Sequence, residues 1–555
     1  FIQLHHAGRQ TTPFVTGGLQ PVAPSPIACR FVKQEPRELE IKEIHAIRDK
    51  FVAAAIFAEK AGFDGVEIHA AHGYLLSQFL SPYSNHRNDE YGGSNENRAR
   101  LVTEIISSIK KYVPRLLVSV RFNMNDFAAG GIDEQMGLII AGQLETAGAD
   151  LLNVSCGIYE SGHTTIEPAF FAEAWRIKMA EQVKKTVRIP VIGGGVIRHP
   201  EKAAEILANQ QADLIWVGRG MLADPAWVGK AVSGRADQIR HCISCNTCFD
   251  SISQGLHIRC AVNPRAGREY KLSLERRLEG IKAVIVGGGP AGIQTSLALS
   301  SAGAQVTLLE KEAHLGGQLN IANKPPYKDK IGWMLQALIE QLEHTNVEIK
   351  LNTVWKNEMI EELKPDVLVI ATGSKPVIPA ISGIESTEIF ALADVLSGKA
   401  VIRQQKVLII GGGSTGCEAA EYLAPHNEVT IVEQAKMLAA GLENMNRLGL
   451  LARIKGLGIK TKKGYIVKRI AGKTVQLLKL SDESEEQIIA DAVIFTCGNI
   501  NNHLSIDHKT PLKVYLIGDA KQPRGIMEAI YEGEMVAEDI AAKRIRNFSS
   551  EGIIK

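Results

Sequence analysis

The chain of 555 residues carries a formal net charge of +2, with 45% apolar and 22% charged residues. This length and composition indicate an ordinary soluble protein with several domains. No dense block of Lys or Arg occurs, which argues against nucleic acid or an anionic membrane surface as the main partner. Apolar runs are too short to span a bilayer, and no charged-then-apolar leader is visible, so neither a membrane span nor a secretion signal is expected.

Residues 1–240 alternate short apolar runs with amphipathic segments. The strand-like runs are 2–4, 66–69, 116–121, 151–155, 190–193 and 214–218. The helical patterns between them are 45–60, 95–112, 135–147, 172–185 and 201–209. Repeating strand–helix units of about forty residues predict a parallel sheet, and their spacing suits a (β/α)8 or TIM barrel.

Glycine and polar residues follow these strands, where barrels place their active sites. Gly194 and Gly195 close the fifth run, and Gly218 and Arg219 close the sixth. Glycines let backbone amides approach a phosphate, so the two loops predict a phosphate-binding site. Arg121 ends another strand, where it could meet an anionic cofactor group or form a structural ion pair.

Two histidines and a tyrosine leave the second run together, as Glu67-Ile-His69-Ala-Ala-His72-Gly-Tyr74. His69 and His72 can each donate a hydrogen bond to a carbonyl oxygen and so polarise a conjugated double bond, and Tyr74 can supply a proton. A lone histidine is usually structural, but three such groups at a strand's carboxyl end predict a catalytic site.

Three segments resemble the Old Yellow Enzyme family of flavin mononucleotide (FMN) barrels, namely residues 3–9, 66–82 and 85–94. The resemblance implies that Gln3 contacts the flavin pyrimidine and that His69 and His72 bind the substrate carbonyl, with Tyr74 as proton donor. It also implies FMN contacts from the loop residues named above: Arg121, Gly194, Gly195, Gly218 and Arg219. Because residues 3–9 resemble the family's third strand, we expect two further barrel strands before Phe1.

Four cysteines follow the barrel: Cys242, Cys245, Cys248 and, after eleven further residues, Cys260. Three thiols at this spacing are typical of iron–sulfur ligation, whereas zinc sites usually take two separated pairs. We therefore predict a 4Fe-4S cluster, with zinc or unliganded thiols as the alternatives. With a cluster in place, a reducing cytoplasm suits the remaining scattered cysteines better than a disulfide framework does.

A strand, a glycine turn and a helix follow from residue 281, with glycines at Gly287, Gly289 and Gly292. Glu310 ends the next strand, about twenty residues on, where a carboxylate accepts ribose hydroxyls in dinucleotide-binding folds. The pattern recurs with Gly411, Gly413, Gly416 and Glu433.

This order resembles the two-dinucleotide flavoprotein disulfide reductases. The resemblance implies flavin adenine dinucleotide (FAD) on the first fold, nicotinamide on the second, inserted fold, and Asp519 on the FAD ribityl chain. The redox Cys-x4-Cys of those enzymes is absent after Glu310, where the chain reads Gly316-Gly317-Gln318-Leu319. We expect Gln318 among the FAD contacts, and electrons to leave this FAD through the cysteine cluster.

The predicted order is a barrel at 1–240, a cluster segment at 241–270, an FAD domain at 271–395 and 500–555, and an NAD domain at 396–499. It resembles the group of 2,4-dienoyl-CoA reductase, enoate reductase, trimethylamine dehydrogenase and bile-acid enoyl reductases. The resemblance implies an NADH-dependent ene reductase. Electrons would pass from NADH through FAD, the cluster and FMN to the β-carbon of an α,β-unsaturated carbonyl compound, and Tyr74 would protonate the α-carbon.

One position departs from the dienoyl-CoA reductases, which carry a histidine after the sixth barrel strand to assist the tyrosine. Tyr159 stands there in this chain, which weakens dienoyl-CoA as the substrate. Two alternatives stay open: an oxidative amine dehydrogenase or demethylase, and a non-catalytic electron-transfer or scaffold module with zinc. Neither the substrate nor the oligomeric state, a homo-oligomer included, follows from the chain.

Overall fold

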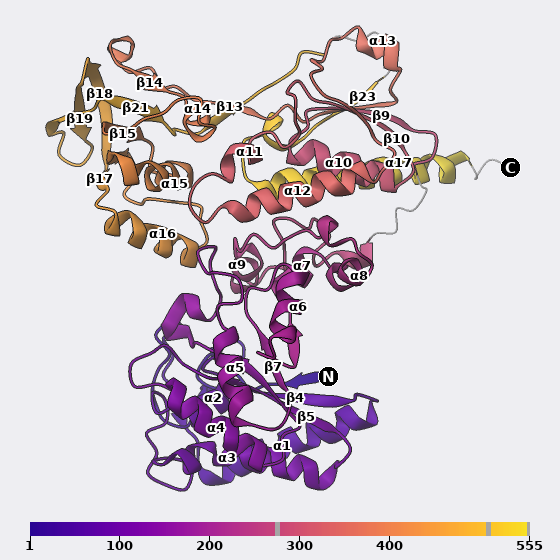
Figure 1. Cartoon of the computed structure of the whole chain (residues 1–555), viewed down its shortest axis with the longest axis vertical. Coiled ribbons are helices and arrows are strands. Elements are labelled where there is room, and N and C mark those ends of the chain that lie inside the picture. Colours follow the sequence, from indigo (N-terminus) through magenta and orange to yellow (C-terminus); the bar gives the residue numbers. More distant parts are fainter. Residues whose placement is uncertain (272–277, 507–511, 552–555) are drawn as a thin grey trace. The chain divides into compact units, whose positions relative to one another are not determined.

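The computed structural model describes residues 1–271, 278–506 and 512–551 (Figure 1). Contacts divide the chain into two units. The barrel unit is Phe1–Glu167 with Phe171–Gly218, and the nucleotide unit is Pro168–Phe170 with Arg219–Lys555. The short segment Pro168–Phe170 belongs to the nucleotide unit because the Ala169 amide donates to Asn446 Oδ1 at 3.0 Å and the Arg453 guanidinium lies 5.1 Å from the Phe170 ring centroid.

Six parallel strands form the sheet of the barrel unit, in the order β1-β4-β5-β6-β7-β8. Their bounds are Ile2–Leu4, Gly65–Ala70, Leu117–Asn123, Leu151–Ser155, Val191–Gly194 and Leu214–Trp216. All six predicted runs are therefore strands, and each pairs in parallel with the next. Parallel neighbours need crossover connections, and the helices between the strands supply them.

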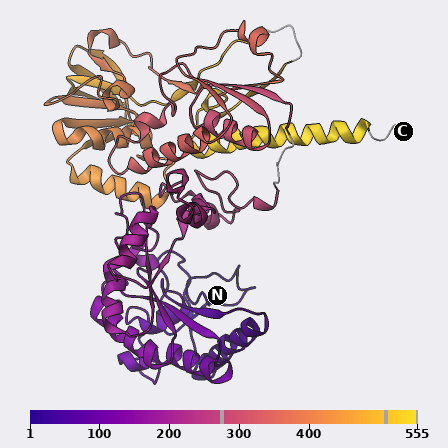
Figure 2. The same ribbon diagram turned by 45° about the vertical axis from the view of Figure 1, so that its right-hand side comes forward.

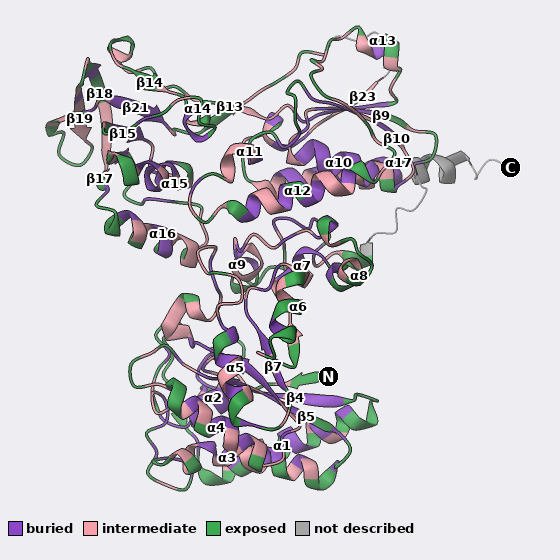
Figure 3. Cartoon of the chain, viewed as in Figure 1, coloured by how far each residue is buried: buried purple, intermediate pink, exposed green. Residues whose placement is uncertain are grey.

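The helices of the barrel unit follow the predicted alternation. They are α1 Ile41–Lys60, α2 Leu75–Leu80, α3 Asn95–Tyr112, α4 Glu134–Thr146, α5 Ile177–Thr186 and α6 Pro200–Ala208. Figure 2 shows the larger helices as an arc around the strands. Figure 3 shows exposed outer faces on these helices, whereas the central strands β4, β5 and β6 are largely buried. The predicted helix start at residue 172 was wrong: residues 173–176 form turns, and α5 begins at Ile177.

The nucleotide unit contains two parallel five-stranded sheets. The first, β11-β10-β9-β12-β23, consists of Glu348–Lys350, Gln305–Leu309, Lys282–Val286, Val367–Ile370 and Lys513–Leu516. The second, β14-β21-β15-β16-β17, consists of Ile389–Phe390, Ala492–Phe495, Lys406–Ile410, Glu428–Glu433 and Lys460–Lys463. The chain enters the second sheet from the first and returns to it, as expected for an inserted domain.

Helices and a small sheet complete the nucleotide unit. Helices α10 Pro290–Ser301, α12 Asp329–Glu343 and α17 Ile526–Glu551 lie along the first sheet (Figure 1). Helices α15 Ser414–Leu423 and α16 Asn444–Gly456 belong to the second. The antiparallel strands β18 Tyr465–Ala471, β19 Thr474–Lys479 and β20 Glu485–Ile489 form a separate sheet. No helix in the described part of the chain is long and apolar enough to cross a membrane.

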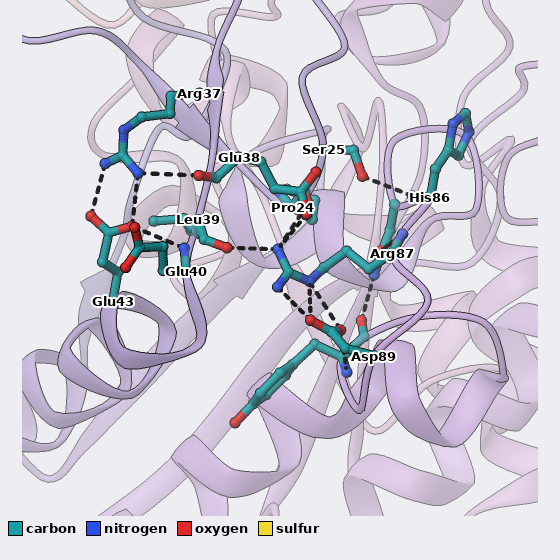
Figure 4. Close-up of polar contacts among 12 residues, drawn as sticks. Pro24, Ser25, Arg37, Glu38, Leu39, Glu40, Glu43, His86, Arg87 and Asp89 are labelled. Carbon is teal, nitrogen blue, oxygen red and sulfur yellow. Dashed lines mark hydrogen bonds and ion pairs between the residues drawn. The ribbon is translucent and has the colours of Figure 1, made fainter.

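A buried arginine ties the loops of the barrel unit together (Figure 4). The Arg87 side chain is 5% exposed, and its Nη1 donates to the carbonyl oxygens of Leu39 at 2.7 Å and Pro24 at 3.1 Å. Its Nε donates to the Asp89 carboxylate at 3.1 Å, and this contact lowers the pKa of Asp89. One planar guanidinium thus joins three chain segments, a geometry that lysine cannot reproduce.

We predict that Arg87→Met destabilises the barrel unit by roughly 3 kcal/mol, because two buried carbonyls and a carboxylate lose their donors. For a unit of this size that corresponds to a fall in Tm of about 6–12 °C. Arg37→Met is the matched control: Arg37 pairs with Glu43 in the same region, but its side chain is 46% exposed, so the Tm should hardly change. Calorimetry of both variants tests this, and equal Tm values would contradict it.

Candidate active site

Because neighbouring strands are parallel, the predicted site residues of the barrel unit lie opposite one another on adjacent strands. Glu67 of β4 pairs with Gln3 of β1 and with Ser119 of β5, and His69 pairs with Arg121. The Glu67 carboxylate accepts hydrogen bonds from Gln3 Nε2 at 2.7 Å, Asn153 Nδ2 at 2.8 Å and Ser119 Oγ at 3.2 Å. This network fixes the amide of Gln3, the residue predicted to meet the flavin.

The two histidines form a hydrogen-bonded chain. His69 Nδ1 accepts from the Ala71 amide at 3.3 Å, so the ring proton of neutral His69 resides on Nε2. That Nε2 lies 3.3 Å from His72 Nδ1, and His72 Nε2 lies 2.7 Å from Ser155 Oγ. His69 Nε2–H therefore donates to His72 Nδ1, and His72 Nε2–H donates to Ser155 Oγ. His72 has a φ of 62°, in the left-handed turn between β4 and α2.

Burial keeps both imidazoles neutral. It lowers the pKa of His69 to about 3, with smaller contributions from Arg121 and His5. The pKa of His72 is also well below its ordinary value, again mainly through burial and then through Arg121. Neutral imidazoles can donate hydrogen bonds to a carbonyl oxygen, but at neutral pH they hold no extra proton to transfer.

Tyr74 stands beside the histidines at the start of α2. Its ring meets His69 edge-on, with centroids 5.0 Å apart, and His5 at 4.4 Å. Its hydroxyl lies 3.0 Å from the hydroxyl of Tyr159, which is on the short helix η1 Tyr159–Thr164. The structure thus brings together the three predicted catalytic residues, and adds His5 and Tyr159.

Two buried donors in the barrel unit, one on Arg121 and one on Trp216, have no acceptor among the described residues. Within the described residues, neither Arg121 Nε nor Trp216 Nε1 has a hydrogen-bond partner, and the Arg121 guanidinium lies 5.0 Å from the Trp216 ring centroid. A Cβ on Gly194 would come within 2.5 Å of the Trp216 ring. Unsatisfied buried donors beside glycine loops fit a polar, anionic cofactor such as FMN.

The remaining two expected flavin residues lie where the units join in the chain. Gly218 ends the barrel unit, and Arg219 begins the nucleotide unit and helix α7 Arg219–Ala223. Within the nucleotide unit, Arg219 Nη1 donates to Asn246 Oδ1. Their contribution to FMN binding therefore stays a prediction.

Sequence reasoning missed one buried arginine of the barrel unit. Arg176 Nη1 donates to Ser155 Oγ at 3.3 Å, and its Nη2 donates to the Thr164 carbonyl at 2.6 Å. Its side chain also fills the space where a Cβ on Gly195 would stand. Arg176 thereby joins the histidine chain to the glycine loop after β7. It stands at the edge of an ordinary amphipathic pattern, which gives no signal for such a role.

Four cysteines of the nucleotide unit line one cavity together with Arg219 and Asn246, namely Cys242, Cys245, Cys248 and Cys260. All are free thiols, and burial raises the pKa of Cys248 to about 11 and that of Cys260 to about 12. Within the described residues, no group of three or more His, Cys, Asp or Glu surrounds a single metal-ion position. The loop that carries these cysteines nevertheless directs hydrogen-bond donors towards two of their sulfurs.

Donors point at two of these sulfurs. The Ser244 amide lies 3.4 Å from Cys242 Sγ, and Thr247 Oγ1 donates to Cys245 Sγ at 3.2 Å. Ser244 and Asn246 have positive φ angles of 53° and 61°, which turn the loop back on itself. Hydrogen bonds to sulfur are a feature of iron–sulfur ligation, and buried thiolates need a neighbouring cation, so the donor set fits a cluster.

Both glycine loops of the nucleotide unit have the geometry of dinucleotide-binding turns. Gly287 and Gly411 have φ angles of 110° and 109°. A Cβ on Gly292 would lie 1.9 Å from the Gly287 carbonyl oxygen, and one on Gly416 would lie 2.0 Å from that of Gly411. The middle glycines, Gly289 and Gly413, face open space, where a pyrophosphate could approach.

The two acids and the FAD residues are held in place by loop contacts. Glu310 Oε2 accepts from the Gly288 amide at 2.6 Å, and Glu433 Oε2 accepts from the Gly412 amide at 2.5 Å. Gln318 Nε2 donates to Ser374 Oγ, and Ser374 Oγ donates to Asp519 Oδ2, both at 3.0 Å. Ser374, which sequence reasoning missed, thus joins the two predicted FAD residues Gln318 and Asp519.

A cavity of about 390 Å³ lies within the nucleotide unit. It is bordered by Cys245 of the cysteine run, Lys328 before α12, Glu418 of α15 and Met527 of α17. The cysteine run and both nucleotide folds therefore border one space.

Comparisons with known proteins agree with this architecture. Residues 1–238 match the NADH:flavin oxidoreductase / NADH oxidase family, and residues 281–521 match the pyridine nucleotide-disulphide oxidoreductases. An NADH oxidase from Thermoanaerobacter brockii is 45% identical over 552 residues, covering 97% of this chain and 84% of its own length. The chain belongs to the NADH:flavin oxidoreductase / NADH oxidase family.

Other members of this fused group are similar over nearly the whole chain. A cinnamate reductase from Clostridium sporogenes is 35% identical, covering 97% of this chain and 84% of its own length. The solved structure of a 2-naphthoyl-CoA reductase with 2-naphthoyl-CoA has a TM-score of 0.91 at 29% identity, covering 96% of this chain and 84% of that one. As a member of the family, the protein is an oxidoreductase with flavin and pyridine nucleotide cofactors, and its α/β fold combines a TIM-barrel region with Rossmann-type domains.

We predict that His69 and His72 stay neutral from pH 7.5 down to pH 5.5, because burial lowers the pKa of each ring. Nitrogen-15 NMR of histidine-labelled protein should show two rings with the proton on Nε2 throughout this range, assigned through His69→Gln and His72→Gln. Because the pKa is depressed, the neutral rings favour folding above about pH 6.5, and this stability is lost as the pH falls towards 3. Protonation of either ring near pH 6.5, the value of exposed imidazole, would contradict the assignment.

Proposed function

We propose that the protein is an NADH-dependent iron–sulfur flavoprotein ene reductase that reduces the C=C bond of an α,β-unsaturated carbonyl compound, such as an enoate, enoyl-CoA or enone. The observation that carries the proposal is the pair of neutral imidazole donors, His69 and His72, beside the hydroxyl of Tyr74. A cinnamate reductase and a 2-naphthoyl-CoA reductase among the similar proteins support the same class of substrate.

Each of the three side chains has one task in this reaction. The imidazole N–H groups bind the substrate carbonyl oxygen and draw electron density from the β-carbon, where hydride adds. In the free protein these donors are engaged by His72 Nδ1 and Ser155 Oγ, so the carbonyl oxygen has to replace an acceptor of the protein. Such rearrangement on binding is common in active sites. Tyr74 then gives its hydroxyl proton to the α-carbon.

The cofactors supply hydride and single-electron transfer when bound, and the chain holds them at separate places. Arg121, Gln3 and the loops after β7 and β8 would hold FMN. Cys242, Cys245, Cys248 and Cys260 would hold a 4Fe-4S cluster. The loop at Gly287 with Glu310, Gln318 and Asp519 would hold FAD, and the loop at Gly411 with Glu433 would hold NADH.

Anaerobic assays with a panel of enoates, enoyl-CoAs, enones and amines test the proposed activity. NADH oxidation coupled to saturation of a C=C bond is expected with at least one unsaturated carbonyl. Failure of every unsaturated compound, or electron flow from an amine to a dye, would instead support the oxidative alternative.

We predict that Cys245→Ala separates the two halves of the reaction. NADH should still reduce an artificial dye at the nucleotide unit, whereas enone reduction and bound iron should both be lost, because one cluster ligand is missing. Cys497→Ala is the control, since this exposed thiol lies outside the cysteine cavity. Enone reduction that survives in iron-free Cys245→Ala protein would contradict the proposed electron path.

We also predict that NADH is preferred to NADPH. The Glu433 carboxylate is held by the amides of Gly412 and Ala435 at the end of β16, so it cannot turn away from an extra phosphate without losing both bonds. Two like charges about 4 Å apart cost about 1–4 kcal/mol, which gives at least a roughly fivefold preference in kcat/KM. Glu433→Gln should reduce this preference, and Glu485→Gln on the exposed strand β20 should not. A parent enzyme that prefers NADPH would contradict the role of Glu433.

A further inference from the structure

Arg219 is a charged side chain on the cavity of the four cysteines. The cavity is lined by these cysteines, by Arg219 and Asn246, and otherwise by apolar residues. Arg219 is half-buried, and its Nη1 donates to Asn246 Oδ1. An amide oxygen is a neutral acceptor, so this bond holds the guanidinium without cancelling its charge. A fixed positive charge therefore borders the cavity that the four thiols share.

Two partners of opposite kind fix the side-chain amide of Asn246. Arg219 can only donate hydrogen bonds, and the Glu443 carboxylate can only accept them. The Asn246 oxygen therefore faces Arg219, and Asn246 Nδ2 donates to Glu443 Oε2 at 3.4 Å. Glu443 is itself held at the start of α16 by the amides of Met445 and Asn446, at 2.9 and 3.1 Å. Asn246 is 1% exposed, so these contacts give the Arg219 guanidinium a defined place on the cavity.

The charge of Arg219 acts on two of the thiols. Burial raises the pKa of Cys245 and that of Cys248, and in both cases the Arg219 guanidinium opposes the shift. A positive charge close to a thiol favours its thiolate, which is the form that binds metal. The same charge also favours any further electron that is added to a site of bound thiolates.

A second arginine, Arg240, lies towards another of the thiols. Its Nη1 donates to the carbonyl oxygen of Val262 at 3.2 Å, and its charge interacts with Cys260. The carboxylates of Glu534 and Asp224 interact with it more strongly than this thiol does. Carboxylates thus balance the charge of Arg240, whereas Arg219 is bonded to the neutral amide oxygen of a residue on the cavity.

We propose that Arg219 raises the reduction potential of the iron–sulfur cluster held by the four cysteines, because it places a fixed positive charge beside their sulfurs. This proposal rests on the cluster of the proposed function and is independent of the substrate. In the proposed electron path the site accepts one electron from FAD and passes the same electron to FMN, so no bond forms or breaks there. The ligand thiolates are already negative, and the added electron increases that charge. A neighbouring guanidinium lowers the energy of the reduced form and so raises its potential.

The sequence resemblance implies a different partner for Arg219, namely FMN. The structure shows its side chain bonded to Asn246 in the loop that carries the cysteines. The two roles differ in the cofactor that depends on this residue. Loss of the charge would change the potential of the cluster in one case and the binding of FMN in the other, and both can be measured on the same protein.

An anaerobic redox titration of the complete, flavin-loaded protein tests the proposal, with the low-temperature electron paramagnetic resonance signal of the reduced cluster as readout. Arg219→Gln removes the charge and keeps a polar side chain. The equilibrium constant for one-electron reduction of the cluster should fall roughly tenfold, as expected when a unit charge leaves a partly buried site. A tenfold change corresponds to a midpoint potential about 59 mV lower for one electron. The iron, FMN and FAD contents of each variant are measured on the same samples.

Two control variants separate the effect of charge at this place from other effects. Arg219→Lys keeps a positive charge, so its potential should stay closer to that of the parent than the potential of Arg219→Gln does. Arg235→Gln removes one positive charge elsewhere in the nucleotide unit. Arg235 is exposed, its Nε donates to Ser233 Oγ at 3.0 Å, and it lies outside the cysteine cavity. Because water and salt screen an exposed charge, the potential of this variant should equal that of the parent.

A further variant tests the contact that holds the guanidinium. Asn246 has a φ of 61°, which glycine adopts without strain, so Asn246→Gly keeps the path of the loop. Without its acceptor the guanidinium loses its defined place, and the potential should fall in the same direction as in Arg219→Gln, but by less. This variant also carries the test should Arg219→Gln assemble no cluster: a lower potential supports the proposal, and a potential equal to that of the parent overturns it.

The outcomes separate this proposal from the proposed function. An unmoved potential in Arg219→Gln, equal falls in Arg219→Gln and Arg219→Lys, or loss of FMN with an unmoved potential would overturn the role of Arg219. The signal of a reduced cluster in the parent protein would then still leave the proposed electron path standing. A parent protein that binds zinc, or no iron, would overturn the cluster of the proposed function and, with it, the role of Arg219.

Discussion

The chemistry of the barrel unit depends on the parallel register of β4, β5 and β6. This register places His69 beside Arg121, Arg121 beside Asn153, and Glu67 beside Ser119. Side chains alternate between the faces of a strand, so a shift of one residue would turn His69 away from Arg121 and break the Glu67 network. The neutral histidine chain, the unsatisfied donor of Arg121 and the orientation of Gln3 all follow from this one arrangement of strands.

Local signals predicted much of the fold. The six strands of the barrel unit and the two glycine turns each have a pattern within a few consecutive residues. Such a pattern reflects backbone requirements that are set by residues close together in the sequence. The glycine turns are the clearest case, because the carbonyl of the first glycine leaves no room for a Cβ on the third. The start of α5 was misplaced by the same reasoning, since the amphipathic pattern continues through residues that form turns.

Contacts between distant residues could not be predicted in the same way. Arg176 reaches Ser155, and Ser374 reaches Gln318 and Asp519, through side chains whose partners lie on other elements. No periodicity encodes such contacts, because they depend on how the elements pack. The proximity of the three predicted catalytic residues was predictable because they lie within six residues and resemble a known motif. That Tyr159 touches Tyr74 became visible only with the loop after β6 in place.

Burial decides the roles of the ionisable groups in both units. In the nucleotide unit it disfavours thiolates, so the four cysteines need a cationic group to become ligands. In the barrel unit it disfavours imidazolium, so His69 and His72 can polarise a carbonyl but cannot protonate carbon at neutral pH. In the proposed reaction the proton for the α-carbon would therefore come from a phenol, and the Tyr74 ring lies against His69. The Tyr159 hydroxyl lies 3.0 Å from the Tyr74 hydroxyl, on a loop where the neighbouring Glu160 pairs with the buried Arg9.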